Sequence, residues 1–219
     1  MPRLLFEKTG NAVWMSHLDL MRLFQRAFKR AGLPLTHTQG YNPRPSVSIA
    51  LPLSVGVESY CELLDFDLYG DPVSCEDILA KLNGALVEGV RVLKVYEEGA
   101  KIKHLSFLDC TVDLEYDNGI PEAAAAQIAA LFSQSEILVE KKGKNGIVEQ
   151  NIAPMIKKLE VSPVDDHVIR LRARICCQNP TLNPAQMVAA IQLYLPEYAP
   201  DFTKCSRLEI YDTQEEIFR

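Results

Sequence analysis

The chain has 219 residues, of which 47% are apolar and 24% charged, and its formal net charge is −6. This composition is typical of a globular protein and excludes a disordered or collagen-like chain, while the length favours two domains of about 100 residues. The sequence contains neither a run of about 18 apolar residues nor a signal-peptide core, so we expect a cytoplasmic protein without a membrane-spanning helix.

The distribution of charge indicates a candidate binding site, whereas the cysteines do not. Residues 1–45 contain seven Lys or Arg and two acids, a net +5, so the other 174 residues carry −11. Because local potential steers binding more than total charge does, this segment is a candidate site for an anionic partner.

The six cysteines lack a CxxC spacing, so no metal or cofactor is predicted, and the adjacent Cys176 and Cys177 are interpreted as core residues.

The first half of the chain alternates helical and strand patterns. We expect a strand at 2–8, a helix from His17 to Ala31, strands at 46–51 and 61–68, a helix at 74–86 and a strand at 90–96. Ser16 followed by Asp19 resembles a capping box, which places the start of the first helix at His17. The apolar residues of this helix recur at helical spacing, and its Lys and Arg residues lie on the other side.

The second half shows a similar order after an expected linker at 99–104. We expect a strand at 108–116, a helix at 121–132 with Pro121 in its first position, a strand at 136–141, a strand at 167–176, a helix at 184–194 capped by Asn183, and a strand at 206–211. The segment 147–159 is ambiguous, and a short strand plus a helical turn is one interpretation of it. The order strand, helix, strand, strand, helix, strand is typical of the ferredoxin-like sandwich. We therefore predict an α+β fold of two tandem ferredoxin-like domains, residues 1–99 and 105–219.

Two groups of side chains in the N-terminal half are candidates for binding RNA. The first is a basic stripe on the first helix: Arg22, Arg26, Lys29 and Arg30. The second is a loop with two prolines, which we expect to be rigid and exposed and which offers His37, Tyr41, Asn42 and Arg44. An aromatic ring for base stacking, an amide and an arginine on one loop match single-stranded RNA recognition. The alternatives are a solvated helix face and a rigid turn whose Tyr41 packs on the helix.

Two histidines are candidate acids or bases. His17, next to Asp19 at the helix start, is either a site histidine that acts as a phosphate donor or general acid, or a partly buried residue at the strand–helix junction. His37 belongs to the proline-containing loop and would be the other candidate acid or base.

Other charged groups indicate a function less specifically. The acids Glu58, Glu62, Asp65 and Asp67 are interpreted as partly polar strand edges rather than metal ligands. The lysines Lys141, Lys142 and Lys144 are predicted to form a basic hairpin tip. The cations Arg170, Arg172 and Arg174 share one strand face, as a second polyanion contact or as an exposed face paired with carboxylates.

Three motifs carry a resemblance to a known family. SHLDL at 16–20, GYNP at 40–43 and LPLSVGVE at 51–58 stand in the order found in the bacterial radical-SAM-linked proteins, which are encoded beside or fused to a cobalamin-binding radical SAM protein. The resemblance is most specific from Leu4 to Asp67 and continues weakly to TLNPAQM at 181–187. It implies a radical SAM partner enzyme and supplies no catalytic residues. Because this chain lacks the three-cysteine cluster motif, the radical chemistry would belong to the partner.

The leading hypothesis is a non-catalytic binding subunit that acts with a radical SAM partner in RNA modification. The residues expected to contact RNA are His17, Arg22, Arg26, Lys29, Arg30, His37, Tyr41, Asn42 and Arg44. One alternative is a metal-independent endoribonuclease of the Cas6-like type, with His17 or His37 as acid or base. The other is a protein-only adaptor for the radical SAM enzyme.

Overall fold

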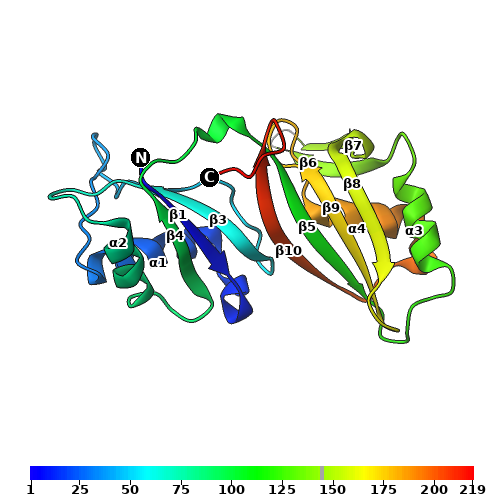
Figure 1. Cartoon of the computed structure of the whole chain (residues 1–219). Helices are drawn as coiled ribbons and strands as arrows, with labels where there is room; N and C mark the ends of the chain where they lie inside the picture. Colours follow the sequence, from blue (N-terminus) through cyan, green and yellow to red (C-terminus); the bar gives the residue numbers. More distant parts are fainter. Residues whose placement is uncertain (144–145) are drawn as a thin grey trace. The chain divides into compact units, whose positions relative to one another are not determined.

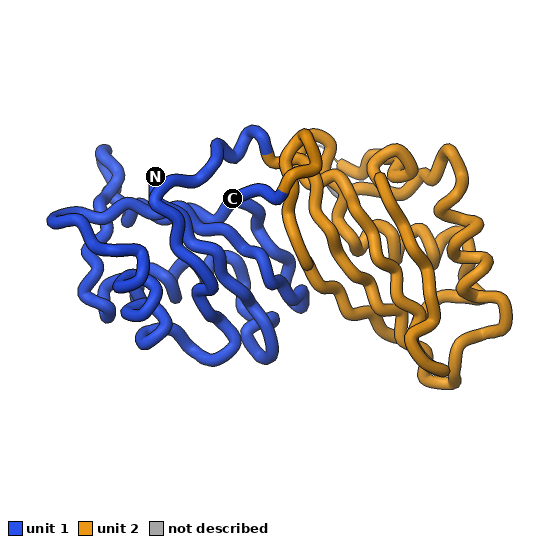
Figure 2. The backbone as a smooth tube through the Cα atoms, viewed as in Figure 1, with its two compact units in different colours: residues 1–104, 217–219 blue, residues 105–216 orange. Residues whose placement is uncertain are grey.

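The chain is described by a computed structural model that covers residues 1–143 and 146–219 and divides into two compact units (Figures 1 and 2). Unit 1 comprises Met1–His104 together with Ile217–Arg219, and unit 2 comprises Leu105–Glu216. The last three residues of the chain therefore belong to the unit that contains the first residues.

Unit 1 is built on an antiparallel sheet with two α-helices. Its elements are β1 (Arg3–Lys8), the 3-10 helix η1 (Gly10–Trp14), α1 (His17–Arg30), β2 (Val47–Ile49), β3 (Glu58–Phe66), α2 (Cys75–Asn83), β4 (Val90–Tyr96) and the 3-10 turn η2 (Ile102–His104). The strands lie in the order β4-β1-β3, and the short β2 pairs with β3. The predicted strand at 46–51 is thus only three residues long, because Pro45 and Pro52 restrict pairing on both sides of it.

The core of unit 1 lies between this sheet and its helices. Alternate residues of β1, Leu4 and Phe6, are fully buried with the apolar stripe of α1. Phe6 meets Phe24 edge-on at 4.7 Å between ring centroids. Burial of each such side chain contributes roughly 1.5–3 kcal/mol, and the resulting contacts fix the face of α1 that remains in solvent.

The end of the chain packs against the start of β1. Arg3 is 2% exposed, and its Nε and Nη2 donate to Asp65 over 2.6 and 2.9 Å. The guanidinium carbon lies 5.3 Å from the ring centroid of Phe218, which is itself buried. A Cβ on Gly99 would lie 2.4 Å from the guanidinium carbon, so a larger residue at this position would displace the Arg3 side chain. Residues from three other segments therefore lie around the Arg3 guanidinium.

Unit 2 repeats the arrangement with an additional hairpin. Its elements are β5 (Leu105–Glu115), α3 (Ala124–Phe132), β6 (Leu138–Gly143), β7 (Gly146–Asn151), the 3-10 turn η3 (Ala153–Met155), β8 (Ile156–Pro163), β9 (Val168–Cys176), α4 (Pro184–Tyr194), the 3-10 turn η4 (Pro196–Tyr198) and β10 (Phe202–Asp212). The antiparallel order is β10-β5-β9-β8, and β6 pairs with β7 in a separate two-stranded sheet.

One open interpretation for the second half is resolved, and one prediction is wrong. The ambiguous segment 147–159 contains the possible short strand and helical turn, followed by a second strand, β8. β8 is the sheet neighbour of β9, whereas the strand predicted at 136–141 belongs to the hairpin. The helix predicted from Pro121 begins at Ala124, because the backbone reverses at Ala123 with a φ of 64°. The capping of α4 by Asn183 matches the expectation and includes the reciprocal bond from Gln186.

At the coarser level, the expected mixture of helices with antiparallel strands is confirmed in both units. Across residues 1–143 and 146–219, each helix is too short or too polar to cross a lipid bilayer.

Candidate nucleic-acid interface

Helix α1 presents its basic residues to solvent because its other side is in the core. Ser16 caps the helix: its hydroxyl accepts from the amide of Asp19 over 3.2 Å and donates to the Asp19 carboxylate over 2.7 Å. This hydrogen bond from Ser16, with help from Arg22, lowers the pKa of Asp19. The predicted capping role is therefore present, and Asp19 remains charged at neutral pH.

The four cations of the stripe are exposed but differ in their contacts. Arg22 is paired with Asp19 over 3.2 Å, an exposed pair of small energetic weight. Arg30 donates to the carbonyl of Ala85 over 2.6 Å, which ties the end of α1 to the segment after α2. For Arg26 and Lys29, no ion pair or hydrogen bond is recorded within the described residues. These two cations are thus the ones most available to phosphate.

The loop with two prolines is the tip of a hairpin. His37 and Pro45 form a β-bridge, the amide of Thr38 donates to the carbonyl of Arg44 over 2.8 Å, and the amide of Arg44 donates to the Thr38 hydroxyl over 3.1 Å. In Figure 1 the segment, coloured between blue and cyan, projects as a narrow loop. The stem therefore holds the tip residues without help from the helix.

The base of this hairpin is fastened to the end of β3. The amide of Thr36 donates to the carbonyl of Asp67 over 2.9 Å, and the amide of Asp67 donates to Ser46 over 3.2 Å. The hydroxyl of Thr36 also donates to the Asp67 carboxylate over 2.9 Å. These anchors were not predicted from the sequence; the alternation of threonines at 36 and 38 was the available signal.

Tyr41 stands at the tip with a relative exposure of 106%, which shows that it does not pack on the helix, contrary to one of the two expectations. Gly40 has a φ of 144°, a conformation that glycine adopts readily. Asn42 and Arg44 are also exposed, as is His37. The hairpin therefore displays an aromatic ring, an amide and a guanidinium in solvent.

His17 and the basic stripe are not joined to the hairpin by any recorded hydrogen bond, ion pair or ring contact of the described residues. His17 is partly buried, and its Nδ1 atom is buried without a hydrogen-bond partner in the described part of the chain. No hydrogen bond of the His37 ring is recorded for these residues either. A histidine acid or base with a neighbouring orienting group is therefore not seen among them.

The acids after the hairpin are structural. Asp65 binds Arg3 and Asp67 binds Thr36, and both belong to the interior or end of β3, which has neighbours on both sides. Glu62 is 1% exposed, so the interpretation as partly polar strand edges is wrong for it. Within residues 1–143 and 146–219, no group of three or more potential metal-ligating side chains is found.

The arginines of β9 are largely committed to carboxylates of β5. Arg170 binds Asp113 with two bonds of 2.6 Å, and Arg174 binds Asp109 over 2.8 and 3.0 Å. Arg174 also stacks on Tyr211 at 3.9 Å. Of the two alternatives for this face, pairing with carboxylates therefore holds for these two residues; Arg172 lies between them opposite Thr111 and Glu160.

Two further expectations concern unit 2. Lys141 donates to the carbonyl of Thr181 over 3.3 Å, whereas the side chains of Lys142 and Lys144 lie outside the described residues. Cys176 and Cys177 are both buried, as predicted, and burial raises the pKa of the Cys177 thiol to about 12. Neither cysteine is therefore a reactive thiolate near neutral pH.

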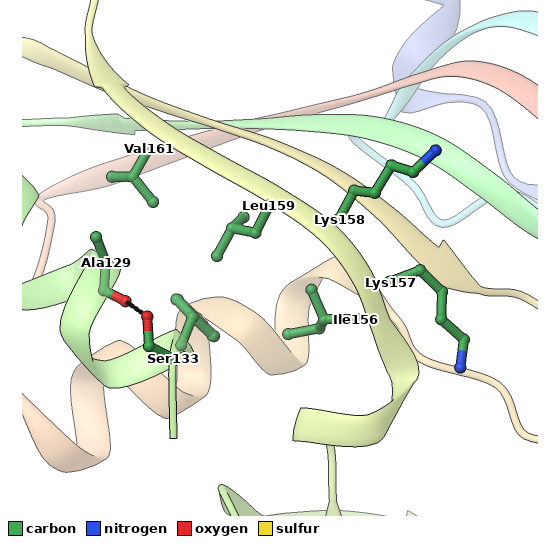
Figure 3. Close-up of a pocket in the computed structure, with 8 residues that line it drawn as sticks. Ala129, Ser133, Ile156, Lys157, Lys158, Leu159 and Val161 are labelled. Carbon is green, nitrogen blue, oxygen red and sulfur yellow. Dashed lines mark hydrogen bonds between the residues drawn. The ribbon is translucent and has the colours of Figure 1, made fainter. Parts of the chain in front are cut away.

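A cavity of about 300 Å³ lies between α3 and β8 (Figure 3). Its wall combines the apolar side chains of Ile156, Leu159 and Val161 with polar groups. The hydroxyl of Ser133 donates to the carbonyl of Ala129 over 2.8 Å. The side chains of Lys157 and Lys158 point away from the helix side.

A solved structure resembles this chain in fold at low sequence identity. A chain of the structure "Crystal Structure of a Cbf5-Nop10-Gar1 Complex" aligns with a TM-score of 0.55 at 9% identity, over 95% of this chain and 48% of that chain. "Crystal Structure of an Unknown Protein from Galdieria sulphuraria" aligns with a TM-score of 0.26 at 12% identity, over 94% of this chain and 96% of that chain. Among curated proteins, no sequence matches this chain. A family model, in contrast, matches residues 2–184, and the chain therefore belongs to the family described as "Uncharacterized protein conserved in bacteria (DUF2344)".

Proposed function

We propose that this chain is a non-catalytic RNA-binding subunit that acts with a radical SAM enzyme in RNA modification. The observation that carries the proposal is Tyr41, fully exposed at the tip of a hairpin whose stem is closed by backbone hydrogen bonds. An exposed aromatic ring on a preformed support can stack on an unpaired base, an interaction worth about 1–3 kcal/mol per base. The stem is ordered before binding, so little conformational entropy is lost when RNA arrives.

Charged neighbours supply the contacts to phosphate. Arg44 stands at the end of the hairpin stem, while Arg26 and Lys29 project from α1 with no recorded partner in the described residues. Such contacts release counterions from the nucleic acid and make binding depend on salt. Arg22, Arg30, His17 and His37 would act as secondary contacts of the same surface, and Asn42 would read a base edge.

The proposal also specifies the fold of the chain and its partner enzyme. The strand orders β4-β1-β3 with β2 beside β3, and β10-β5-β9-β8, support two ferredoxin-like sandwiches, the second enlarged by the β6–β7 hairpin. The proposed domains are 1–99 and 105–219, although Ile217–Arg219 pack with unit 1. The likeness to a chain of the Cbf5-Nop10-Gar1 complex supports the fold alone. The radical SAM partner follows from the motifs SHLDL, GYNP and LPLSVGVE, which resemble the radical-SAM-linked proteins.

The test is anisotropy of a fluorescein-labelled single-stranded RNA 12-mer, measured with the purified chain at low and high salt. We expect Tyr41→Ala to weaken binding about tenfold, whereas Phe202→Ala removes an exposed aromatic ring of unit 2 and leaves binding unchanged. Lys29→Gln should reduce the slope of log K against log salt by about 0.7, and Lys81→Gln, on α2, should not. Binding that is insensitive to salt or to Tyr41→Ala would contradict the proposal.

The same preparation separates the two alternatives. Cleavage of the RNA in the presence of a metal chelator, lost in His17→Ala or His37→Ala, would establish the endoribonuclease. Absence of RNA binding at low salt together with co-purification of a radical SAM protein would establish the adaptor. The binding subunit is expected to leave the RNA intact and to release it as salt is raised.

A further inference from the structure

The β6–β7 hairpin has an open edge. The bond from the amide of Ile152 to the carbonyl of Ile137, 2.9 Å, marks a hydrogen-bonded pair of the ladder. Because such pairs alternate in an antiparallel ladder, the backbone groups of Ile147 and Glu149 point away from β6. In the described part of the chain no partner is recorded for these groups, and residues 146–149 are exposed. β7 therefore presents unpaired donors and acceptors in a row.

The opposite edge of the hairpin is protected instead. The hydroxyl of Tyr194 accepts from the amide of Leu138 over 3.2 Å and donates to its carbonyl over 3.0 Å. On the β8 edge of the main sheet, Lys157, Lys158 and Pro163 supply the charges and the proline that discourage added strands. β7 has the opposite character, since Ile147 and Val148 are 62% and 53% exposed.

Charge on the hairpin indicates what would pair there. Glu140 stands directly opposite Glu149, so the two exposed carboxylates share one face. Like charges on directly paired strand residues repel each other. No ion pair is recorded for Glu140 or Glu149 within the described residues. A second copy paired through β7 would add two more carboxylates to the same face. A strand that carries a cation would relieve the repulsion.

We propose that the outer edge of β7 is a docking site for an extended basic segment of a partner protein. The segment adds as a third strand of the hairpin, with its backbone bonded to Ile147 and Glu149. A Lys or Arg of the segment lies beside Glu149, and an apolar neighbour on the other face lies beside Val148. The site is distinct from the surface of α1 and the 36–46 hairpin.

The probe is a fluorescein-labelled peptide, Thr-Val-Lys-Val-Lys-Val-Thr, with a control peptide in which both lysines are glutamates. Anisotropy should show binding of the basic peptide and at least tenfold weaker binding of the acidic one. Ile147→Pro removes an outward amide but no bond to β6, and should weaken the basic peptide at least tenfold. Glu149→Lys should reverse the preference between the two peptides, which a purely structural role of Glu149 would not do.

Hydrogen exchange of the Val139 and Lys141 amides is measured as a control. If it is unchanged in Ile147→Pro, the hairpin is intact in this variant. The proposal is overturned if the basic peptide fails to bind, or if it binds the intact Ile147→Pro variant equally well. It is also overturned if sedimentation shows a dimer of the wild-type chain that becomes monomeric in Ile147→Pro, since the occupant is then a second copy. Loss of RNA binding in that variant would assign the edge to RNA instead.

Discussion

Single residues explain why some contacts could be predicted and others could not. The exposure of the loop around Tyr41 follows from two prolines and a glycine, whose backbone preferences are local. The pairing of Arg174 with Asp109 joins residues 65 positions apart, so it depends on a strand register that the alternation of β9 does not contain. Sequence alone could therefore place three cations on one face but not choose between their two roles.

Asp109 should make stability depend on pH. Burial alone would raise the pKa of Asp109, but hydrogen bonds from Arg174 and Tyr211 outweigh it and the pKa lies below its usual value. A carboxyl group whose folded pKa is depressed stabilises the protein above its unfolded pKa, near 3.9, and this contribution is lost as the pH falls through the folded pKa. We expect Asp109→Asn to lower the free energy of unfolding by about 2 kcal/mol at pH 7 and by clearly less at pH 3, in urea titrations.

The control for this prediction is Asp166→Asn, an exposed residue without a recorded side-chain bond in the described part of the chain. Its cost should stay small at both pH values. An equal cost of Asp109→Asn at pH 7 and pH 3 would show that the carboxylate charge is not what stabilises the network.

Secondary-structure elements were predicted best where a local signal marks their ends. Ser16 and Asn183 were identified as caps because their side chains bond to backbone amides within the same turn. The start of α3 was misplaced because Pro121 is an equally strong local signal, yet the backbone turns at Ala123. The segment 147–159 lacked a clear period, and its strands are fixed by pairing with β6 and β9.

The same misplaced helix start gives a testable substitution. Ala123 is held at a φ of 64°, which costs an L-residue with a Cβ roughly 1–2 kcal/mol relative to glycine. We expect Ala123→Gly to raise the free energy of unfolding by about 1 kcal/mol in chemical denaturation. Ala126→Gly, at an exposed position inside α3, should lower it by about 1 kcal/mol. Destabilisation by both would mean that the left-handed turn is not retained in solution.

At the scale of the whole molecule, the order of elements could be predicted but the discontinuity of unit 1 could not. Ile217–Arg219 is too short to carry a period, and its place beside Arg3 depends on contacts with the other end of the chain. For a related reason, the sequence did not predict that β6 and β7 form a separate sheet. The alternation of apolar and polar residues identifies a strand but not the strand with which it pairs.

Phe218→Ala should therefore destabilise the N-terminal unit. The ring is 2% exposed, and its loss should cost about 3 kcal/mol. Hydrogen exchange is expected to accelerate at the amides of β1 and β4, while the amides of β9 in unit 2 keep their protection. Ile217→Ala, at a residue that is 58% exposed, should change exchange little. Equal acceleration in β1 and β9 would show that Phe218 does not act on unit 1 specifically.

The place of Phe218 also has a consequence for synthesis on the ribosome. Chains emerge from the N-terminus at about 5–20 residues per second, and domains generally fold as they emerge. Here the strands and helices of unit 1 emerge long before Phe218, so Arg3 lacks one of its covering groups until Phe218 has been translated. Unit 2 is continuous in sequence and can complete its sheet first. Unit 1 is thus synthesised first but completes its folding after unit 2.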